Sequence, residues 1–179
     1  MTTSAEPTCV VVMGVSGAGK STVARALADR LAWSLAEADE FHPPANIAKM
    51  SAGTPLTDAD RAPWLAAIRD WVTARAAMGE STVVTCSALK HAYRDVLREA
   101  GARVRFLHLD GTADVIDDRL RHRSGHFMPP SLLRSQFDAL EPLRPDEDGA
   151  AVGVADPPEL IVEHAVTRLD LPVPNPATT

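Results

Sequence analysis

The chain has 179 residues, and 45% of them are apolar, which is enough for one domain with a buried core. The 18 Lys and Arg against 24 Asp and Glu leave a formal net charge of −6. That balance argues against a nucleic-acid partner, because a phosphate backbone binds basic surfaces. No apolar stretch approaches the roughly 20 residues that span a bilayer, and no signal core follows the N-terminus. We therefore expect a cytoplasmic protein without a membrane partner.

The first elements are expected to be a strand, a glycine-rich turn and a helix. Cys9–Met13 is a continuous apolar run, typical of a strand buried on both faces of a parallel sheet. Apolar residues then recur at helical spacing within Ser21–Leu31. A short strand at Ser34–Glu37 leads through the polar segment 39–44 to a short helix at Ala45–Ser51. This order predicts the opening of a βαβ unit.

The later part of the chain repeats the alternation of strands and helices. Thr57 offers cap chemistry for a long helix, expected from about Ala62 to Met78 and closed by Gly79. The elements expected after it are strand Ser81–Cys86, helix Lys90–Ala100, strand Val104–Leu109, helices Thr112–Arg123 and Ser131–Leu140, strand Ala151–Val154 and helix Pro158–Leu169. The pattern predicts one α/β domain over 1–179, a three-layer, doubly wound parallel sheet of five strands.

Two smaller expectations concern the cysteines and the ends of the chain. Cys9 and Cys86 fall in apolar runs and are expected to be buried, reduced thiols, although counting alone permits a disulfide. No cysteine or histidine cluster has metal-ligand spacing. Residues 1–7 and 172–179 are expected to fray, because they are short or proline-rich and have little to bury.

A phosphate-binding loop lies between the first strand and the first helix. Residues 14–21 match G-x-x-x-x-G-K-[ST] at every fixed position. Glycines let successive N–H groups point at phosphate oxygens, and the helix adds its positive dipole end. Lys20 is expected to bridge the β- and γ-phosphates of ATP, and the Ser21 hydroxyl to ligate Mg²⁺. The residues expected to bind the nucleotide are Gly14, Val15, Ser16, Gly17, Ala18, Gly19, Lys20, Ser21 and Thr22.

The motif alone leaves the class of protein open. A turn that merely joins a strand to a helix is the alternative, but the buried strand and amphipathic helix around it favour nucleotide binding. The chain lacks the N-K-x-D sequence of GTPases. Asp110 ends an apolar strand as in larger ATPases, yet a solvated turn residue before Gly111 is the favoured interpretation. At this length, a small-metabolite kinase is the leading hypothesis.

Further motifs allow a comparison with a known family. They occur in one order between about Val10 and Asp148, and they are Ala38–Pro43, Asn46–Met50, Gly53–Arg61, Pro63–Leu65, Cys86–Lys90, Tyr93–Asp95, Leu97–Arg98, Arg119–Leu120, Arg123, Gly125–Met128, Ser135–Phe137 and Leu140–Glu141. Together they resemble the bacterial gluconokinases. Ala38 stands where the family usually has Gly, Glu37 where some relatives have Asp, and residues 149–158 are only loosely similar.

The resemblance implies a nucleoside-monophosphate-kinase-like fold with a helical lid at about residues 119–135. It also implies a homodimer that phosphorylates D-gluconate at the 6-hydroxyl, using ATP and Mg²⁺, and so supplies 6-phospho-D-gluconate to the pentose phosphate route. Two alternatives stay open at this point. One is a shikimate-kinase-like enzyme of small metabolites, and the other is a nucleotide-binding regulator without catalysis.

Several polar residues at the ends of the second strand and beyond are candidates for the acceptor site. Asp39 is expected to accept a hydrogen bond from the attacking hydroxyl, as base or orienting group, or else to cap the next helix. Glu37 is a candidate to hold a magnesium-bound water, or is a surface acid. Arg61 is the expected clamp on the carboxylate, unless it pairs with an aspartate near it. His42 and Lys49 are expected substrate contacts.

The remaining candidates lie farther along the chain. Ser87 and Lys90 follow the third strand at the ligand edge, although Ser87 could instead cap the helix after it. Arg94 is a weaker candidate, and Gln136 is suggested as a hydroxyl contact by the resemblance alone. Arg119 and Arg123 are expected to belong to a lid and to act on the transferred phosphate, with a solvated basic face as the alternative.

Overall fold

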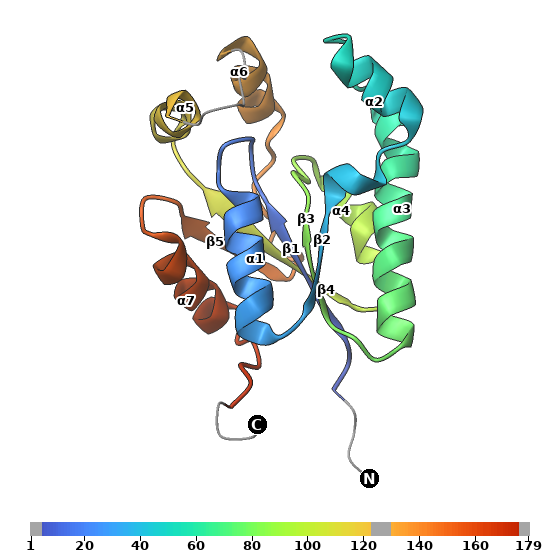
Figure 1. Cartoon of the computed structure of the whole chain (residues 1–179), viewed down its shortest axis with the longest axis vertical. Helices are drawn as coiled ribbons and strands as arrows, with labels where there is room; N and C mark the ends of the chain where they lie inside the picture. The colour runs from blue at the N-terminus through green and yellow to red at the C-terminus, as the bar shows by residue number, and fades with distance from the viewer. Residues whose placement is uncertain (1–4, 123–129, 176–179) are drawn as a thin grey trace.

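The structure, a computed structural model, describes residues 5–122 and 130–175. Its centre is one parallel sheet with the strand order β2-β3-β1-β4-β5 (Figure 1). The strands are β1 (Thr8–Met13), β2 (Ser34–Glu37), β3 (Thr82–Thr85), β4 (Arg103–Asp110) and β5 (Gly149–Gly153). The predicted doubly wound α/β fold with five parallel strands is confirmed.

Helices cover both faces of this sheet, and smaller helices stand at the edge where the strands end (Figure 1). Helices α1 (Lys20–Leu31) and α7 (Pro158–Arg168) cover one face, and α3 (Asp58–Ala77) and α4 (His91–Arg98) cover the other. At the carboxyl edge lie the 3-10 helix η1 (Ala38–Phe41), α2 (Pro44–Ser51), α5 (Ala113–Arg121) and α6 (Pro130–Ala139). None of the helices in the described ranges is long and apolar enough to cross a membrane.

The central strand β1 shows how the core is divided between the two faces. Val10 and Val12 join the apolar cluster beneath α1 and α7, whereas Val11 and Met13 join the cluster beneath α3 and α4. All four are buried, because a strand in the middle of a covered parallel sheet has no solvent-facing side. Both faces of the sheet therefore hold β1 in place, and the loop that follows it leaves from a rigid support.

Both cysteines are buried and unpaired, as predicted. Cys9 lies on β1, and Cys86 follows β3. Burial raises the pKa of each thiol to about 12. Both thiols therefore stay protonated at neutral pH and behave as small apolar side chains.

Helix α3 begins at Asp58, one turn before the expected start near Ala62. A capping box explains the difference: the Thr57 side chain accepts a hydrogen bond from the Asp60 amide, and the Asp60 side chain accepts one from the Thr57 amide. Proline is typical of the first helical turn, and Pro63 would fit a helix that begins near Ala62. In the structure, Pro63 lies inside α3 instead. The other expected boundaries lie within two residues of the observed ones, and those of β2 are identical at both ends.

An ion pair without solvent exposure joins α4 to the segment after α6. The Arg94 Nε donates to Glu147 at 2.7 Å, and both side chains are 0% exposed. The same guanidinium donates to the backbone carbonyls of Ala88, Leu89, Glu141 and Pro142. The interpretation of Arg94 as a substrate contact is therefore wrong, because its donors are all used inside the protein.

Removing one member of this ion pair should lower the free energy of unfolding more than removing both members. We expect Arg94→Met to lower the free energy of unfolding by about 3–5 kcal/mol, because it leaves the Glu147 charge buried alone. The double substitution Arg94→Met/Glu147→Leu should be more stable than that single variant, since no unpaired charge remains. Urea unfolding of the single and the double variant measures both free energies. The control Arg98→Met breaks partly exposed pairs on the same helix and should cost less than about 1 kcal/mol.

Candidate functional site

The loop between β1 and α1 is a tight bend that only glycine allows at its turning points. Gly14 and Gly17 have φ angles of 143° and 84°. A Cβ atom at Gly14 would lie 2.9 Å from the Leu109 carbonyl oxygen, and one at Gly17 would lie 2.8 Å from the Leu120 side chain. The Lys20 ammonium donates to the carbonyls of Gly14 and Val15 at 3.1 Å each. The predicted phosphate loop therefore has the curled backbone that its motif requires.

An acid and two hydroxyls meet beside the first turn of α1. The Ser21 hydroxyl donates to Glu37 Oε2 at 3.0 Å, and the Thr85 hydroxyl donates to the same oxygen at 2.6 Å. Glu37 ends β2 and Thr85 ends β3, in register with each other. These are oxygen ligands of the kind that Mg²⁺ binds directly or through water. The two residues expected at the metal, Ser21 and Glu37, are thus adjacent, and Thr85 was not foreseen.

Side chains from α5 and α6 contact the phosphate loop from the other side. Arg119 donates to the Ala18 carbonyl at 3.4 Å and also to the Val154 carbonyl. Gln136 accepts a hydrogen bond from the Ser16 amide at 2.7 Å, and its Nε2 lies 3.4 Å from the Ser16 hydroxyl. Arg119 therefore lies beside the phosphate loop, and Gln136, expected at an acceptor hydroxyl, contacts that loop as well. Arg123 lies outside the described residues.

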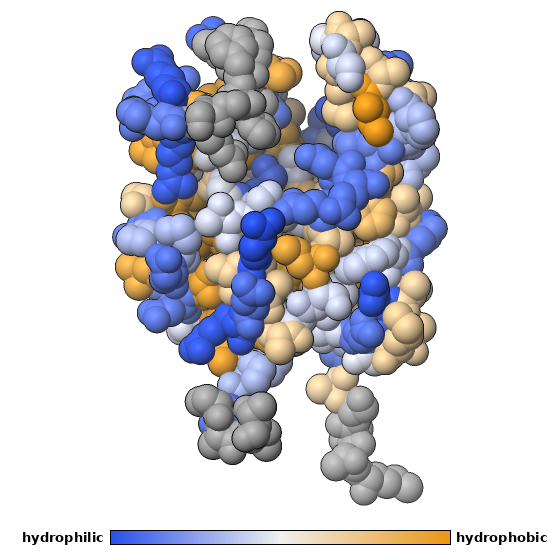
Figure 2. All heavy atoms as spheres, viewed as in Figure 1, coloured by the Kyte–Doolittle hydropathy of each residue, from blue (hydrophilic) through white to orange (hydrophobic). Residues whose placement is uncertain are grey.

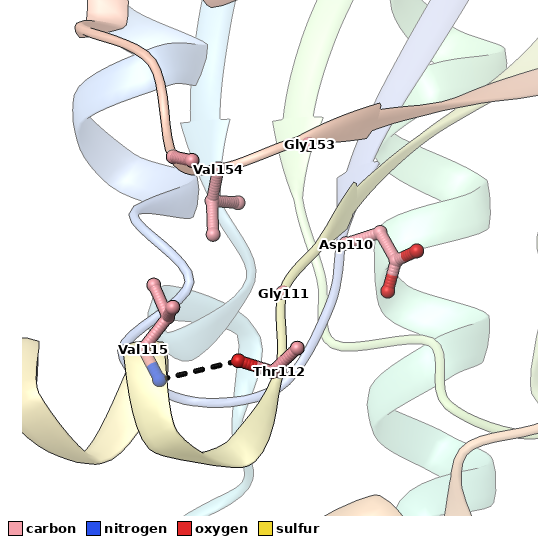
Figure 3. Close-up of a pocket in the computed structure, with 7 residues that line it drawn as sticks. Asp110, Gly111, Thr112, Val115, Gly153 and Val154 are labelled. Carbon is pink, nitrogen blue, oxygen red and sulfur yellow. Dashed lines mark hydrogen bonds between the residues drawn. The ribbon is translucent and has the colours of Figure 1, made fainter.

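A pocket of about 300 Å³ opens beside Arg119 where β4 and β5 end (Figure 3). Its lining residues are Asp110, Gly111, Thr112, Val115, Gly153, Val154 and Ala155. The Thr112 hydroxyl accepts from the Val115 amide and so caps α5 (Figure 3). Asp110 is exposed, in agreement with the solvated residue expected before Gly111. This pocket could not be predicted from the sequence, because its walls are mostly small residues and backbone.

Asp39 lies in η1, directly after β2, with an exposed side chain. It does not cap α2, whose N-cap is Pro43 without a side-chain hydrogen bond, so that alternative is wrong. The Cys86 thiol lies close enough to both Lys20 and Asp39 for their charges to act on its pKa, after burial and a backbone hydrogen bond. Asp39 therefore lies at the same edge of the sheet as the phosphate loop, two residues after Glu37, which accepts a hydrogen bond from Ser21.

His42 packs against an aromatic ring at the base of α2. Its imidazole stacks on Trp64 with ring centroids 4.3 Å apart and an interplanar angle of 11°. Its Nδ1 lies 3.3 Å from the Asn46 side-chain amide. Burial lowers the pKa of His42 below 6.5, and the charges of Asp39 and Arg61 act on it in opposite directions. His42 is therefore neutral at pH 7.

The cations expected to meet the acceptor surround the first turn of α3. Lys49 donates to both oxygens of Asp60, at 2.9 and 2.8 Å, and Lys90 donates to Asp58 at 3.2 Å. The hydrogen bonds from Lys49 and from the Thr57 backbone lower the pKa of Asp60 to about 2.

Arg61 makes a different set of contacts from those two lysines. It donates to the Leu56 carbonyl at 2.7 Å and to the Tyr93 hydroxyl at 3.4 Å. In the described part of the chain it forms no ion pair with Asp58 or Asp60, so the alternative of a salt bridge is wrong.

Ser87 contributes to the phosphate loop through its backbone. Its carbonyl accepts a hydrogen bond from the Gly14 amide at 3.3 Å. Helix α4 has Lys90 as its N-cap and no side-chain capping bond, so Ser87 is not the cap. The loop that carries Ser87 and Lys90 is thereby tied to the phosphate loop. The molecular surface is hollowed above this region, between α6 and α2 (Figure 2).

Comparisons with known proteins place the chain among sugar-acid kinases. A family model described as an AAA domain matches residues 9–143. The gluconokinase of Gluconobacter oxydans (strain 621H) is 49% identical over 161 residues, which cover 90% of this chain and 90% of that protein. The predicted resemblance to gluconokinases is confirmed.

Solved structures agree with the sequence relatives. A sugar kinase from Janibacter sp. HTCC2649 is 56% identical, covers 92% of this chain and 95% of its own, and superposes with a TM-score of 0.87. A gluconokinase from Sinorhizobium meliloti 1021 is 48% identical, covers 92% of each chain and has a TM-score of 0.83. The same fold therefore extends over nearly the whole chain.

The environment of His42 predicts a specific dependence of stability on pH. Because its folded pKa lies below 6.5, its contribution to stability is fully present above pH 6.5 and is lost as the pH falls through the folded pKa. NMR titration of the histidines, assigned with His42→Gln, should show His42 protonating below pH 6.5. His42→Gln should lose less stability than the wild type between neutral and mildly acid pH; an equal loss in both would contradict the assignment.

Proposed function

The chain belongs to the gluconokinase family, and on that basis we propose that it transfers the γ-phosphate of ATP to the 6-hydroxyl of D-gluconate, giving 6-phospho-D-gluconate and ADP. The observation that carries this proposal is that the phosphate loop meets the ends of β2 and β3: Ser21, next to Lys20, donates to Glu37, two residues before Asp39, and the Gly14 amide donates to Ser87. Lys20 belongs to a loop built for phosphates, and Asp39 is a carboxylate exposed for an acceptor. Donor and acceptor groups thus share one edge of the sheet.

The donor side is formed by the phosphate loop and the pocket beside it. The inward amides of residues 14–22 and the Lys20 ammonium would hold the phosphates, with the dipole of α1 adding to the attraction. We assign the adenine base to the pocket between Thr112 and Val154, because it is mostly apolar and adjoins the loop. Arg119 contacts both the loop and that pocket, so it lies where it can bind phosphate oxygens when nucleotide replaces its carbonyl partners.

The acceptor side is formed by η1, α2, α3 and the loop after β3. Asp39 would accept the hydrogen bond of the attacking hydroxyl and hold or remove its proton. Arg61 would grip the gluconate carboxylate, since a guanidinium binds two oxygens in a plane. His42, Lys49, Ser87 and Lys90 would contact the remaining oxygens. Gln136, tied to Ser16, is assigned to the donor side instead.

Phosphoryl transfer from these positions needs little covalent work by the protein. The hydroxyl must lie in line with the γ-phosphorus, and the charge on the equatorial oxygens must be balanced. Asp39 would hold the hydroxyl in line, and Lys20 with Arg119 would balance the charge on the equatorial oxygens. The lid expected at about 119–135, of which residues 123–129 lie outside the described part of the chain, remains a proposal: closed over the site, it would exclude water, which would otherwise accept the phosphate.

Magnesium is the metal that this site suits. When bound, it would neutralise charge on the β- and γ-phosphate oxygens. Ser21 would ligate it directly, and Glu37 would hold it through water. Glu37→Gln should therefore raise the magnesium concentration needed for half-maximal activity, by about 10–100-fold, as is typical for outer-sphere groups. An unchanged magnesium requirement would remove Glu37 from the metal site.

Three broader statements rest on the family resemblance and on composition. We propose that the chain is one kinase domain over 1–179, acts as a homodimer in the cytoplasm, and supplies the pentose phosphate route. A net charge of −6 supports the absence of a nucleic-acid partner. Sedimentation equilibrium measures the mass in solution and decides the homodimer directly.

Asp39 provides the sharpest test of this assignment. Asp39→Asn should lower kcat with gluconate by about 10²–10⁴-fold, the usual contribution of a general base, while the affinity for an ATP analogue changes little. The matched control is Glu40→Gln, an exposed acid in the same 3-10 helix, which should keep its activity. A coupled assay that measures ADP release with gluconate, shikimate and nucleoside monophosphates gives the readout.

The outcomes of that assay separate the alternatives. Turnover of shikimate above that of gluconate would overturn the choice of acceptor. A wild type that binds ATP tightly and turns over no acceptor would be a regulator rather than an enzyme. Full activity in Asp39→Asn would leave the enzyme assignment intact but remove Asp39 from its role.

A further inference from the structure

One aromatic ring supports both cations that face the acceptor region from α3 and α4. Tyr93 lies in the first turn of α4 and is 8% exposed. The guanidinium carbon of Arg61 lies 5.6 Å from the centre of its ring, and the Lys90 ammonium lies 5.5 Å from it. Both distances fall within the range of cation–π attraction. The ring therefore forms a common support for two positive charges that come from different helices.

The hydroxyl of the same tyrosine connects these cations to an acid. It donates to Asp58 Oδ1 at 2.5 Å and accepts from Arg61 Nη1 at 3.4 Å. Lys90 donates to that same Asp58 oxygen at 3.2 Å. Asp58 is the first residue of α3, so the network joins the start of α3 to the start of α4. Each cation is thus held by Tyr93 both at its ring and through its hydroxyl.

This network leaves one edge of Arg61 available. Nη1 is used by the Leu56 carbonyl and by the Tyr93 hydroxyl. For Nε and Nη2, residues 5–122 and 130–175 supply no hydrogen-bond acceptor. Nε and Nη2 form the side of a guanidinium that binds a carboxylate with two parallel hydrogen bonds. The contacts on Nη1 therefore fix the direction in which the open edge points.

We propose that Tyr93 is a positioning residue for the sugar acid: its ring and hydroxyl hold Arg61 and Lys90 so that the open edge of Arg61 meets the carboxylate. This inference rests on the proposed function, because it takes a sugar acid as the acceptor. Tyr93 itself need not touch the substrate. Its role is to keep Arg61 from turning toward Asp58, where an ion pair would occupy the binding edge.

The protonation of the network agrees with this arrangement. Burial and the hydrogen bond to Asp58 raise the pKa of Tyr93, so its hydroxyl keeps the proton that it donates. The hydrogen bond from Tyr93, followed by that from Lys90, lowers the pKa of Asp58, so its carboxylate remains charged. At neutral pH the tyrosine is therefore a donor to a carboxylate and never a second anion beside Arg61.

Two substitutions separate the hydroxyl from the ring. Tyr93→Phe keeps the ring and should raise the KM for gluconate about five- to tenfold, as expected when one hydrogen bond that positions Arg61 is lost. Tyr93→Leu also removes the cation–π support and should raise it further, by about tenfold or more over the phenylalanine variant. The KM for ATP and kcat should stay within about twofold, because the lost interaction binds ground and transition states alike.

A matched control removes a hydroxyl of similar structural importance from the far end of α3. The Thr73 hydroxyl donates to the Arg69 carbonyl and accepts from the Gly101 amide. Thr73→Val should lose stability to a degree comparable with Tyr93→Phe, and it should leave both KM values unchanged. A rise in the KM for both substrates in Tyr93→Phe, or a loss of stability alone, would mean that the tyrosine is merely structural and would overturn the proposal.

The chain contains one tyrosine, which makes Tyr93 its own probe. Wild-type protein labelled with fluorotyrosine should give one fluorine resonance, and saturating gluconate should shift it. The neutral alditol of the same carbon length should not, because it lacks the carboxylate. Gluconate turnover without any shift would overturn the role of Tyr93 and leave the proposed function standing. An absence of gluconate turnover in the wild type would instead defeat the proposed function itself.

Discussion

The tight backbone bend between Gly14 and Lys20 is the constraint around which the other parts of the site are arranged. The sheet supports it from below, since β1 is buried on both faces. The loop after β3 is hydrogen-bonded to it at Gly14, α5 packs against Gly17, and α6 contacts it at Ser16. A side chain at Gly17 would collide with Leu120 and push α5 away. The positions of Arg119 and of the pocket beside it therefore depend on a loop with almost no side chains.

The acceptor side is arranged by charge rather than by backbone shape. In a chain of net charge −6, the lysines expected to meet an anion are each paired with an aspartate from the first turn of α3. Such pairs are partly exposed and contribute little to stability. A bound carboxylate or hydroxyl can therefore compete for the lysines at small cost. Arg61 differs, because a carbonyl and a tyrosine hold it and leave one edge open.

Much of the fold could be predicted from local patterns in the sequence. The phosphate loop, the buried strands and the helix cap at Thr57 depend on residues that are neighbours along the chain, and each of them appears in the structure. The adjacency of Ser21 and Glu37 also followed, because parallel strands end at one edge. These features are local, or they follow because the strands of a parallel sheet all end at the same edge.

The partners of individual polar side chains were harder to predict. Tyr93 reaches Asp58 across 35 residues, and Gln136 reaches Ser16 across 120. Which groups meet over such distances is decided by helix packing, on which spacing and composition carry no information. Arg94 illustrates the same limit: its place four residues after Lys90 suggested a ligand contact, but the folded chain buries it completely.

The contact between Gln136 and Ser16 has a consequence for the shape of the phosphate loop. A buried backbone amide without a hydrogen-bond partner costs about 1–3 kcal/mol. The carboxamide of Gln136 occupies the Ser16 amide, and Lys20 turns back onto the Gly14 and Val15 carbonyls. The curled loop is thus stabilised in its shape by hydrogen bonds from side chains of its own chain. A nucleotide that binds this loop would then exchange one set of hydrogen bonds for another, and the loop would not have to change its backbone conformation.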